Sequence, residues 1–150
     1  MNKNIKNLEA SVHARLLKIS KANKREFNSI LIQYFQERFL YRLSLSEYNH
    51  NFVLKGALML IVLSEDRFRP TKDIDFLGTS ISTNEGELLE IFKEICKIEY
   101  NDGVSFDDNT ITIEEINKDG DYNGHRIKIK CFLGNLKINI FYFGGYINPI

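Results

Sequence analysis

The sequence predicts an α+β fold in which helices cover one face of a mixed or antiparallel sheet. Apolar residues recur at steps of three and four in the first part of the chain, which is typical of amphipathic helices. From residue 110 onward they recur at steps of two, which is typical of half-buried strands. One short strand and one further helix are expected between these regions. Helices followed by an antiparallel meander indicate α+β architecture.

Length and composition fit a single globular domain. The 150 residues are 43% hydrophobic and 27% charged, which are ordinary values for such a protein. No apolar run reaches membrane-spanning length and no signal-peptide layout opens the chain, so we expect a cytoplasmic protein without a membrane partner. Cys96 and Cys131 lack CxxC spacing and are expected to be reduced, buried thiols. Residues 1–50 form an N-terminal helical segment and residues 51–150 the core.

Two helices are expected in the N-terminal segment. The first has an apolar stripe formed by Leu8, Val12, Leu16 and Ile19. The second begins near Lys24, and its buried side contains Phe27, Leu31, Phe35, Phe39 and Leu43.

The N-terminal segment is strongly basic although the whole chain has a formal net charge of zero. Residues 1–25 contain seven Lys and Arg residues against Glu9 alone, so their net charge is +6. Such a helix can contact nucleic-acid phosphates. The alternative is an ordinary solvated helix face.

The middle of the chain contains a third helix, a strand and a fourth helix. The third helix is expected to open at Lys55-Gly56 and to be buried, because it is apolar nearly all round. A short strand follows at residues 73–77 and ends at Gly78. Asn84, with Glu87 three residues later, resembles a capping box at the start of the next helix.

Three half-buried strands form the expected meander. Their inward side chains alternate with polar ones, as at Ile127 and Ile129 on either side of Lys128. Turns are expected at Asn123-Gly124 and Gly134-Asn135. The acidic stretch from Glu99 to Asp121 is interpreted as a solvated hairpin edge.

The residues with the clearest chemistry are Asp73 and Asp75. Residues i and i+2 of a strand share a face, so the two carboxylates lie side by side while Ile74 points into the core. A divalent cation with oxygen ligands is the natural occupant between them. Mg²⁺ bound in this way usually shares its remaining positions with water and substrate phosphates. A solvated carboxylate pair is the alternative interpretation.

Gly56 supplies a possible phosphate site beside this pair. A glycine at a helix start lets a phosphate approach the free backbone N–H groups and the positive end of the helix dipole. The expected helix is about 15 Å long, and the seven residues after it can extend to about 23 Å. The chain can therefore return and place Asp73 beside the helix start. Four cationic residues are close enough in sequence to be candidates for phosphate contact: Lys55, Arg67, Arg69 and Lys72.

Several separated segments resemble the AbiEii/AbiGii toxin family in the same order. They are FVLKGALML at residues 52–60, RPTKDIDFLG at residues 69–78, and flanking segments at residues 10–46 and 90–107. The resemblance implies a nucleotidyltransferase of the polymerase-β-like fold. It implies that Asp73 and Asp75 are catalytic residues and ligands of Mg²⁺ or Mn²⁺. It also implies that a nucleoside triphosphate contacts Lys55, Gly56, Ala57, Arg69 and Thr71.

The resemblance further implies a function and partners. Such a toxin belongs to a toxin–antitoxin or abortive-infection system and transfers a nucleoside monophosphate from a triphosphate to an acceptor. The acceptor could be tRNA or another RNA, and a cognate antitoxin protein is a further partner. A non-catalytic remnant that binds nucleotide, RNA or an antitoxin is the alternative, and a phosphotransferase of another kind is a third possibility.

Two departures from the family pattern suggest impaired catalysis. The family places a third aspartate on a later strand, and the corresponding position here is about Phe141. No acidic residue occurs from Leu133 to Ile150, and Asp107 and Asp108 are the nearest substitutes in sequence. The helical C-terminal part that family members usually carry is also expected to be missing, which suggests a gene disrupted near this strand.

Overall fold

The computed structural model describes residues 7–55, 73–81, 84–118 and 122–147. The elements in these ranges are helices and strands grouped in separate runs, as in an α+β fold, which confirms the predicted class. In order they are α1 (Leu8–Asn23), α2 (Phe27–Leu45), β1 (Phe52–Lys55), β2 (Asp73–Thr79), α4 (Glu85–Lys97), β3 (Val104–Lys118), β4 (Tyr122–Leu133) and β5 (Leu136–Ile147). None of these helices is long and apolar enough to cross a membrane. The boundary at residue 50 stays a prediction.

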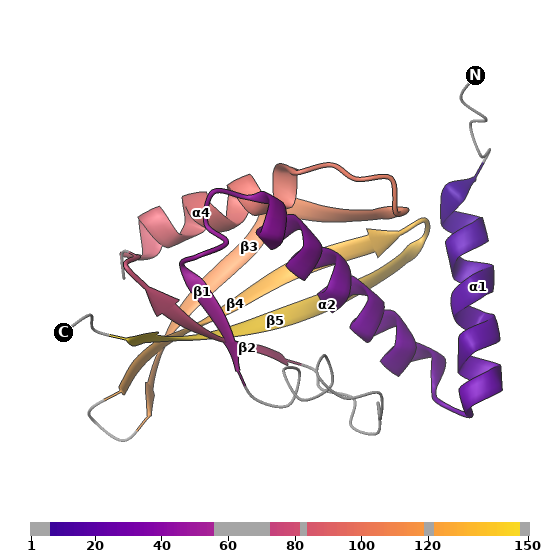
Figure 1. Ribbon diagram of the computed structural model, residues 1–150, viewed down its shortest axis with the longest axis horizontal. Helices are drawn as coiled ribbons and strands as arrows, with labels where there is room; N and C mark the ends of the chain where they lie inside the picture. The colour runs from indigo at the N-terminus through magenta and orange to yellow at the C-terminus, as the bar shows by residue number, and fades with distance from the viewer. Residues whose placement is uncertain (1–6, 56–72, 82–83, 119–121, 148–150) are drawn as a thin grey trace.

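The five strands form one mixed sheet in the order β1-β2-β5-β4-β3 (Figure 1). Strands β3, β4 and β5 are the expected antiparallel meander. Strand β2 pairs parallel to β5, and β1 pairs antiparallel to β2 at the edge. The last strand of the meander therefore lies directly beside the strand that carries the two aspartates.

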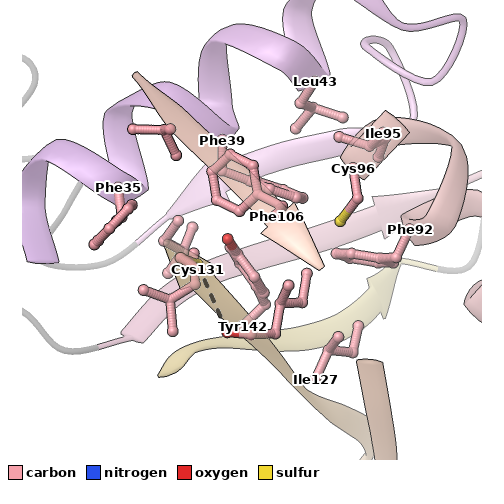
Figure 2. Packing of buried hydrophobic residues seen from close by; sticks show 14 of the residues in the cluster. Phe35, Phe39, Leu43, Phe92, Ile95, Cys96, Phe106, Ile127, Cys131 and Tyr142 are labelled. Atoms are coloured by element: carbon pink, nitrogen blue, oxygen red, sulfur yellow. Dashed lines mark hydrogen bonds between the residues drawn. The ribbon is translucent and has the colours of Figure 1, made fainter. Parts of the chain in front are cut away.

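Helices α2 and α4 pack on the same face of the sheet (Figures 1 and 2). Phe39 of α2 and Phe92 of α4 both contact Tyr142 of β5, with ring centroids 4.4 and 5.8 Å apart. The inward residues Ile129 and Ile140 are completely buried beneath them. Because strand residues alternate between faces, their neighbours on β4 and β5 belong to the opposite face. That face includes the exposed side chains of Lys137 and Asn139.

The predicted helical stripes are largely confirmed. Val12 and Leu16 of α1 are buried, as are Phe35 and Phe39 of α2. Ile19 is an exception, because 44% of its surface is exposed. It lies along an open groove of about 260 Å³ between α1 and α2 instead of being covered.

Helix and turn boundaries differ from the predictions at several positions. Asn84 caps α4 as expected, since its side-chain oxygen accepts a hydrogen bond from the Glu87 N–H at 3.2 Å. Gly78 does not end its strand but lies inside β2. The predicted turn at Asn123-Gly124 is wrong, because both residues pair with β3. The turn at Gly134-Asn135 is confirmed, and Gly134 has a positive φ of 58° that favours glycine.

The acidic stretch after α4 is not solvated throughout, which corrects the sequence interpretation at Asp102. This residue is only 6% exposed. Its carboxylate accepts hydrogen bonds from Arg42 at 2.8 and 3.0 Å and from the Nε of Arg38 at 2.8 Å. Arg42 is 2% exposed and also donates to the carbonyls of Ile98 and Val104. The network joins α2 to the segment between α4 and β3.

Both cysteines are free, buried thiols, as the sequence predicted. Burial raises the pKa of Cys96 to about 12, and the nearby Asp108 carboxylate adds to this effect. Burial likewise raises the pKa of Cys131. Because thiolate is the reactive form, neither side chain is activated as a nucleophile at neutral pH.

We expect both native thiols to react very slowly with dithionitrobenzoate at about pH 8, a pH at which an ordinary thiol is partly ionised. Concentrated urea should release both for rapid reaction, which absorbance measures. The raised pKa of Cys96 also determines how stability changes with pH. The contribution of Cys96 to the free energy of unfolding is fully present below its ordinary pKa of 9.0, and it is lost as the pH rises toward about 12.

Lys97→Cys provides the matched control for this labelling, because the Lys97 side chain is 68% exposed beside Cys96. The introduced thiol should react rapidly in the native protein. Equally rapid reaction of the two natural thiols would show that they are not buried as described.

Candidate active site

The side chains of β2 alternate between the apolar face of the sheet and the opposite face, which carries two carboxylates. Ile74 and Phe76 are 0% and 2% exposed and lie in the core. Asp73 and Asp75 alternate with them and are half-buried on the other side of the sheet. Their Cα atoms are about 6.6 Å apart, because each strand residue rises by about 3.3 Å. Two carboxylates therefore share a partly solvent-accessible face at the end of β2 that follows residues 56–72.

Both neighbouring strands contribute positions beside this pair. Lys55 at the end of β1 is the Cα partner of Asp75. On β5, Phe141 is the partner of Asp73 and Phe143 is the partner of Asp75. The sheet thus brings the predicted Lys55 next to the aspartates, although 18 positions separate Lys55 from Asp73 in the chain.

Two cationic residues lie on β4, which is separated from β2 by β5. Lys128 of β4 pairs with Phe141, and Arg126 pairs with Phe143. Both cationic side chains are half-buried. Since neighbouring strands are about 4.8 Å apart, these residues lie about 10 Å from the aspartates across the sheet. The face therefore has carboxylates on β2 and cations on β4, a distribution suited to a metal ion with a polyanionic ligand.

The other predicted nucleotide contacts are not placed by the structure. Gly56, Ala57, Arg69 and Thr71 lie outside the described residues. The expectation that a helix opens at Lys55 is wrong for that residue, because Lys55 is still paired in the sheet. The expected contact between Gly56 and a triphosphate stays a prediction.

The family model described as "Nucleotidyl transferase AbiEii toxin, Type IV TA system" matches residues 38–149. This match begins within α2 and includes every described strand as well as Asp73 and Asp75. The chain belongs to the AbiEii toxin family. No curated protein matches the sequence.

A solved structure resembles the AbiEii chain over most of its length. It is the crystal structure of JHP933 from Helicobacter pylori, with a TM-score of 0.51 and 19% sequence identity. The similarity covers 83% of the AbiEii chain but only 47% of the JHP933 chain. At this identity the similarity establishes a shared fold. The AbiEii chain thus spans about half the length of that relative.

The position of the expected third carboxylate is now defined. The parallel register places Phe141 directly beside Asp73, where the AbiEii family pattern led us to expect an aspartate. Neither Asp107 nor Asp108 takes the place of this carboxylate. Asp107 pairs with Lys130 on the side of β4 away from β5, and Asp108 forms an ion pair with Lys97 at 3.9 Å. Within the described ranges, no three His, Cys, Asp or Glu side chains converge as a metal site.

Sequence reasoning did not assign Arg126 and Lys128 to the site of this AbiEii chain. The signal was present, because both alternate with the inward residues Ile127 and Ile129 and so must share the outer face. What was missing was the strand order. Only the parallel pairing of β2 with β5 shows that β4 is two strands from the aspartates.

Proposed function

We propose that this AbiEii chain binds a nucleoside triphosphate with Mg²⁺ or Mn²⁺ at Asp73 and Asp75, as a nucleotidyltransferase toxin. The observation that supports this proposal is the arrangement of β2, which puts Asp73 and Asp75 on one partly accessible face, with Lys55 of β1 as the Cα partner of Asp75. The proposed reaction transfers a nucleoside monophosphate to a hydroxyl of an acceptor, with tRNA or another RNA as the acceptor. The type IV toxin–antitoxin family also makes a cognate antitoxin an expected partner.

The residues present fit a bound magnesium ion in part. Mg²⁺ is commonly held by one or two carboxylates together with substrate phosphates and water, and Asp73 and Asp75 supply two carboxylates on one face. When bound, the ion would neutralise phosphate charge. Among the chain's own residues, Lys55 is the Cα partner of Asp75, and we propose that it helps to orient the triphosphate.

The reaction needs a group that accepts a proton. The acceptor oxygen forms a bond to the α-phosphorus, the bond to pyrophosphate breaks, and the hydroxyl proton must leave. A carboxylate next to Asp73 could take that proton, but the position is Phe141. We therefore propose that transfer is slow in this chain. The same observation supports the second candidate, a non-catalytic remnant that still binds nucleotide, RNA or an antitoxin.

Phe141→Asp should increase the transfer rate by about 10²-fold, the lower end of what a positioned general base contributes. The measurement incubates the chain with tRNA, Mg²⁺ and a triphosphate labelled at the α-phosphate, and follows the label on RNA. A parallel reaction uses γ-labelled triphosphate. Label from the γ-phosphate on the acceptor would instead indicate a phosphotransferase.

Asn139→Asp is the matched control for this substitution. Asn139 lies on the same face of β5, two residues from position 141, and pairs with Lys130 instead of Asp73. It adds the same charge but lies away from Asp73, so it should not raise the rate. Equal rates for both variants and the wild type would contradict the assignment of position 141, and no α-label transfer by any of them would favour the non-catalytic candidate.

A further inference from the structure

A row of cations follows β4 on the side of the sheet opposite the helices. Arg126, Lys128 and Lys130 alternate with the buried Ile127 and Ile129.

On β5, Lys137 pairs with Phe132 and extends the row toward the β4–β5 turn. We call these four residues, Arg126, Lys128, Lys130 and Lys137, the β4 basic stripe. The three β4 cations alone span about 13 Å, at about 3.3 Å per residue.

The β4 basic stripe extends beyond the carboxylate pair. Through β5, Arg126 is level with Asp75 and Lys128 is level with Asp73. Lys130 lies one step past this level, and Lys137 lies further toward the β4–β5 turn. A nucleotide confined to the aspartates would approach only the first two cations. The other two require a ligand that continues along the strand.

The charges around the stripe leave its middle cationic. Asp107 of β3 faces Lys130 and Glu114 faces Arg126, but Thr112 faces Lys128. Ion pairs among the described residues do not include Lys128, Lys130 or Lys137. A metal ion at Asp73 and Asp75 would offset the carboxylates on the other side, so the face would attract an extended polyanion most strongly when metal is bound.

We infer that the β4 basic stripe binds the phosphate backbone of the RNA acceptor strand and directs its end toward Asp73 and Asp75. The inference rests on the proposed function, which requires an acceptor hydroxyl at the aspartates. The stripe supplies regularly spaced cations that end at that point. Phosphate contacts of this kind position a strand without reading its sequence.

Helix α1 is the competing basic surface. Its lysines lie on a helix that packs on α2, and its first turn approaches the β4–β5 turn, where a Cβ added at Gly134 would lie 3.4 Å from the Cβ of Glu9. In Figure 1, α1 stands at the end of the sheet away from β2. RNA bound only there would not reach the aspartates, so the two surfaces make different predictions.

The test measures binding of a fluorescent single-stranded RNA by anisotropy over a range of salt concentrations, in the presence of Mg²⁺. Lys130→Gln/Lys137→Gln removes two cations away from the aspartates. We expect weaker binding, and a plot of log affinity against log salt that is shallower by about 1.4, since each single-strand phosphate contact contributes about 0.7. Lys18→Gln/Lys21→Gln on α1 removes the same charge and should leave the slope unchanged.

Calorimetric binding of the Mg²⁺–triphosphate to the same variants separates the inference from the proposed function. Nucleotide binding should be unchanged in Lys130→Gln/Lys137→Gln. Normal nucleotide binding with an unchanged RNA slope in this variant would overturn the stripe while leaving the proposed function intact. Three other results would also overturn the inference about the stripe. They are loss of RNA binding only in the α1 variant, no RNA binding by the wild type, and equal affinity of the wild type for polyglutamate.

Discussion

Asp102→Asn should lower the free energy of unfolding by about 3 kcal/mol, the lower end of the range for removing one partner of a buried ion pair. The Asp102 carboxylate is 6% exposed and accepts hydrogen bonds from two guanidinium groups. The substitution leaves Arg42 buried and charged with only carbonyl acceptors, and it places an amide N–H₂ against guanidinium donors. Urea unfolding followed by circular dichroism measures the change as a shift of midpoint at constant slope.

Asp108→Asn makes the same chemical change at a solvent-screened position. Asp108 is part of a 3.9 Å ion pair with Lys97, and its side chain is 28% exposed. Exposed pairs typically contribute less than about 1 kcal/mol, so this variant should unfold close to the wild type. Similar midpoints for the Asp102 and Asp108 variants would show that the buried network does not stabilise the fold.

The local elements were predictable because each depends on short-range patterns. Steps of three and four place Phe35 and Phe39 on one side of α2, and alternation places Ile74 between two outward aspartates. The Asn84 cap follows from its own side chain and one N–H three residues later. These features need no knowledge of distant contacts.

Long-range arrangement could not be obtained in the same way. The parallel pairing of β2 with β5 joins residues 68 positions apart, such as Asp73 and Phe141. The burial of Asp102 depends on Arg42, which is 60 positions away and lies on helix α2. A charged residue in an acidic stretch appears solvated until its partner is known. The basic residues of β4 gain their importance only from the strand order.

The carboxylate pair is the feature on which the proposed function depends most. Asp73→Asn/Asp75→Asn removes both charges while preserving the shape of the side chains. Because both residues are only half-buried, the fold should persist, which circular dichroism can check. Metal-dependent nucleotide affinity should be lost, because amide oxygens carry no net charge to hold the cation.

The most direct measurement is calorimetric titration of each of the four nucleoside triphosphates into the protein, with and without Mg²⁺. We predict that the wild type binds at least one triphosphate only when Mg²⁺ is present. Asp73→Asn/Asp75→Asn should abolish this binding, and Asp107→Asn/Asp108→Asn on β3 should retain it. No metal-dependent binding by the wild type, or equal binding by the Asp73→Asn/Asp75→Asn variant, would contradict the proposed site.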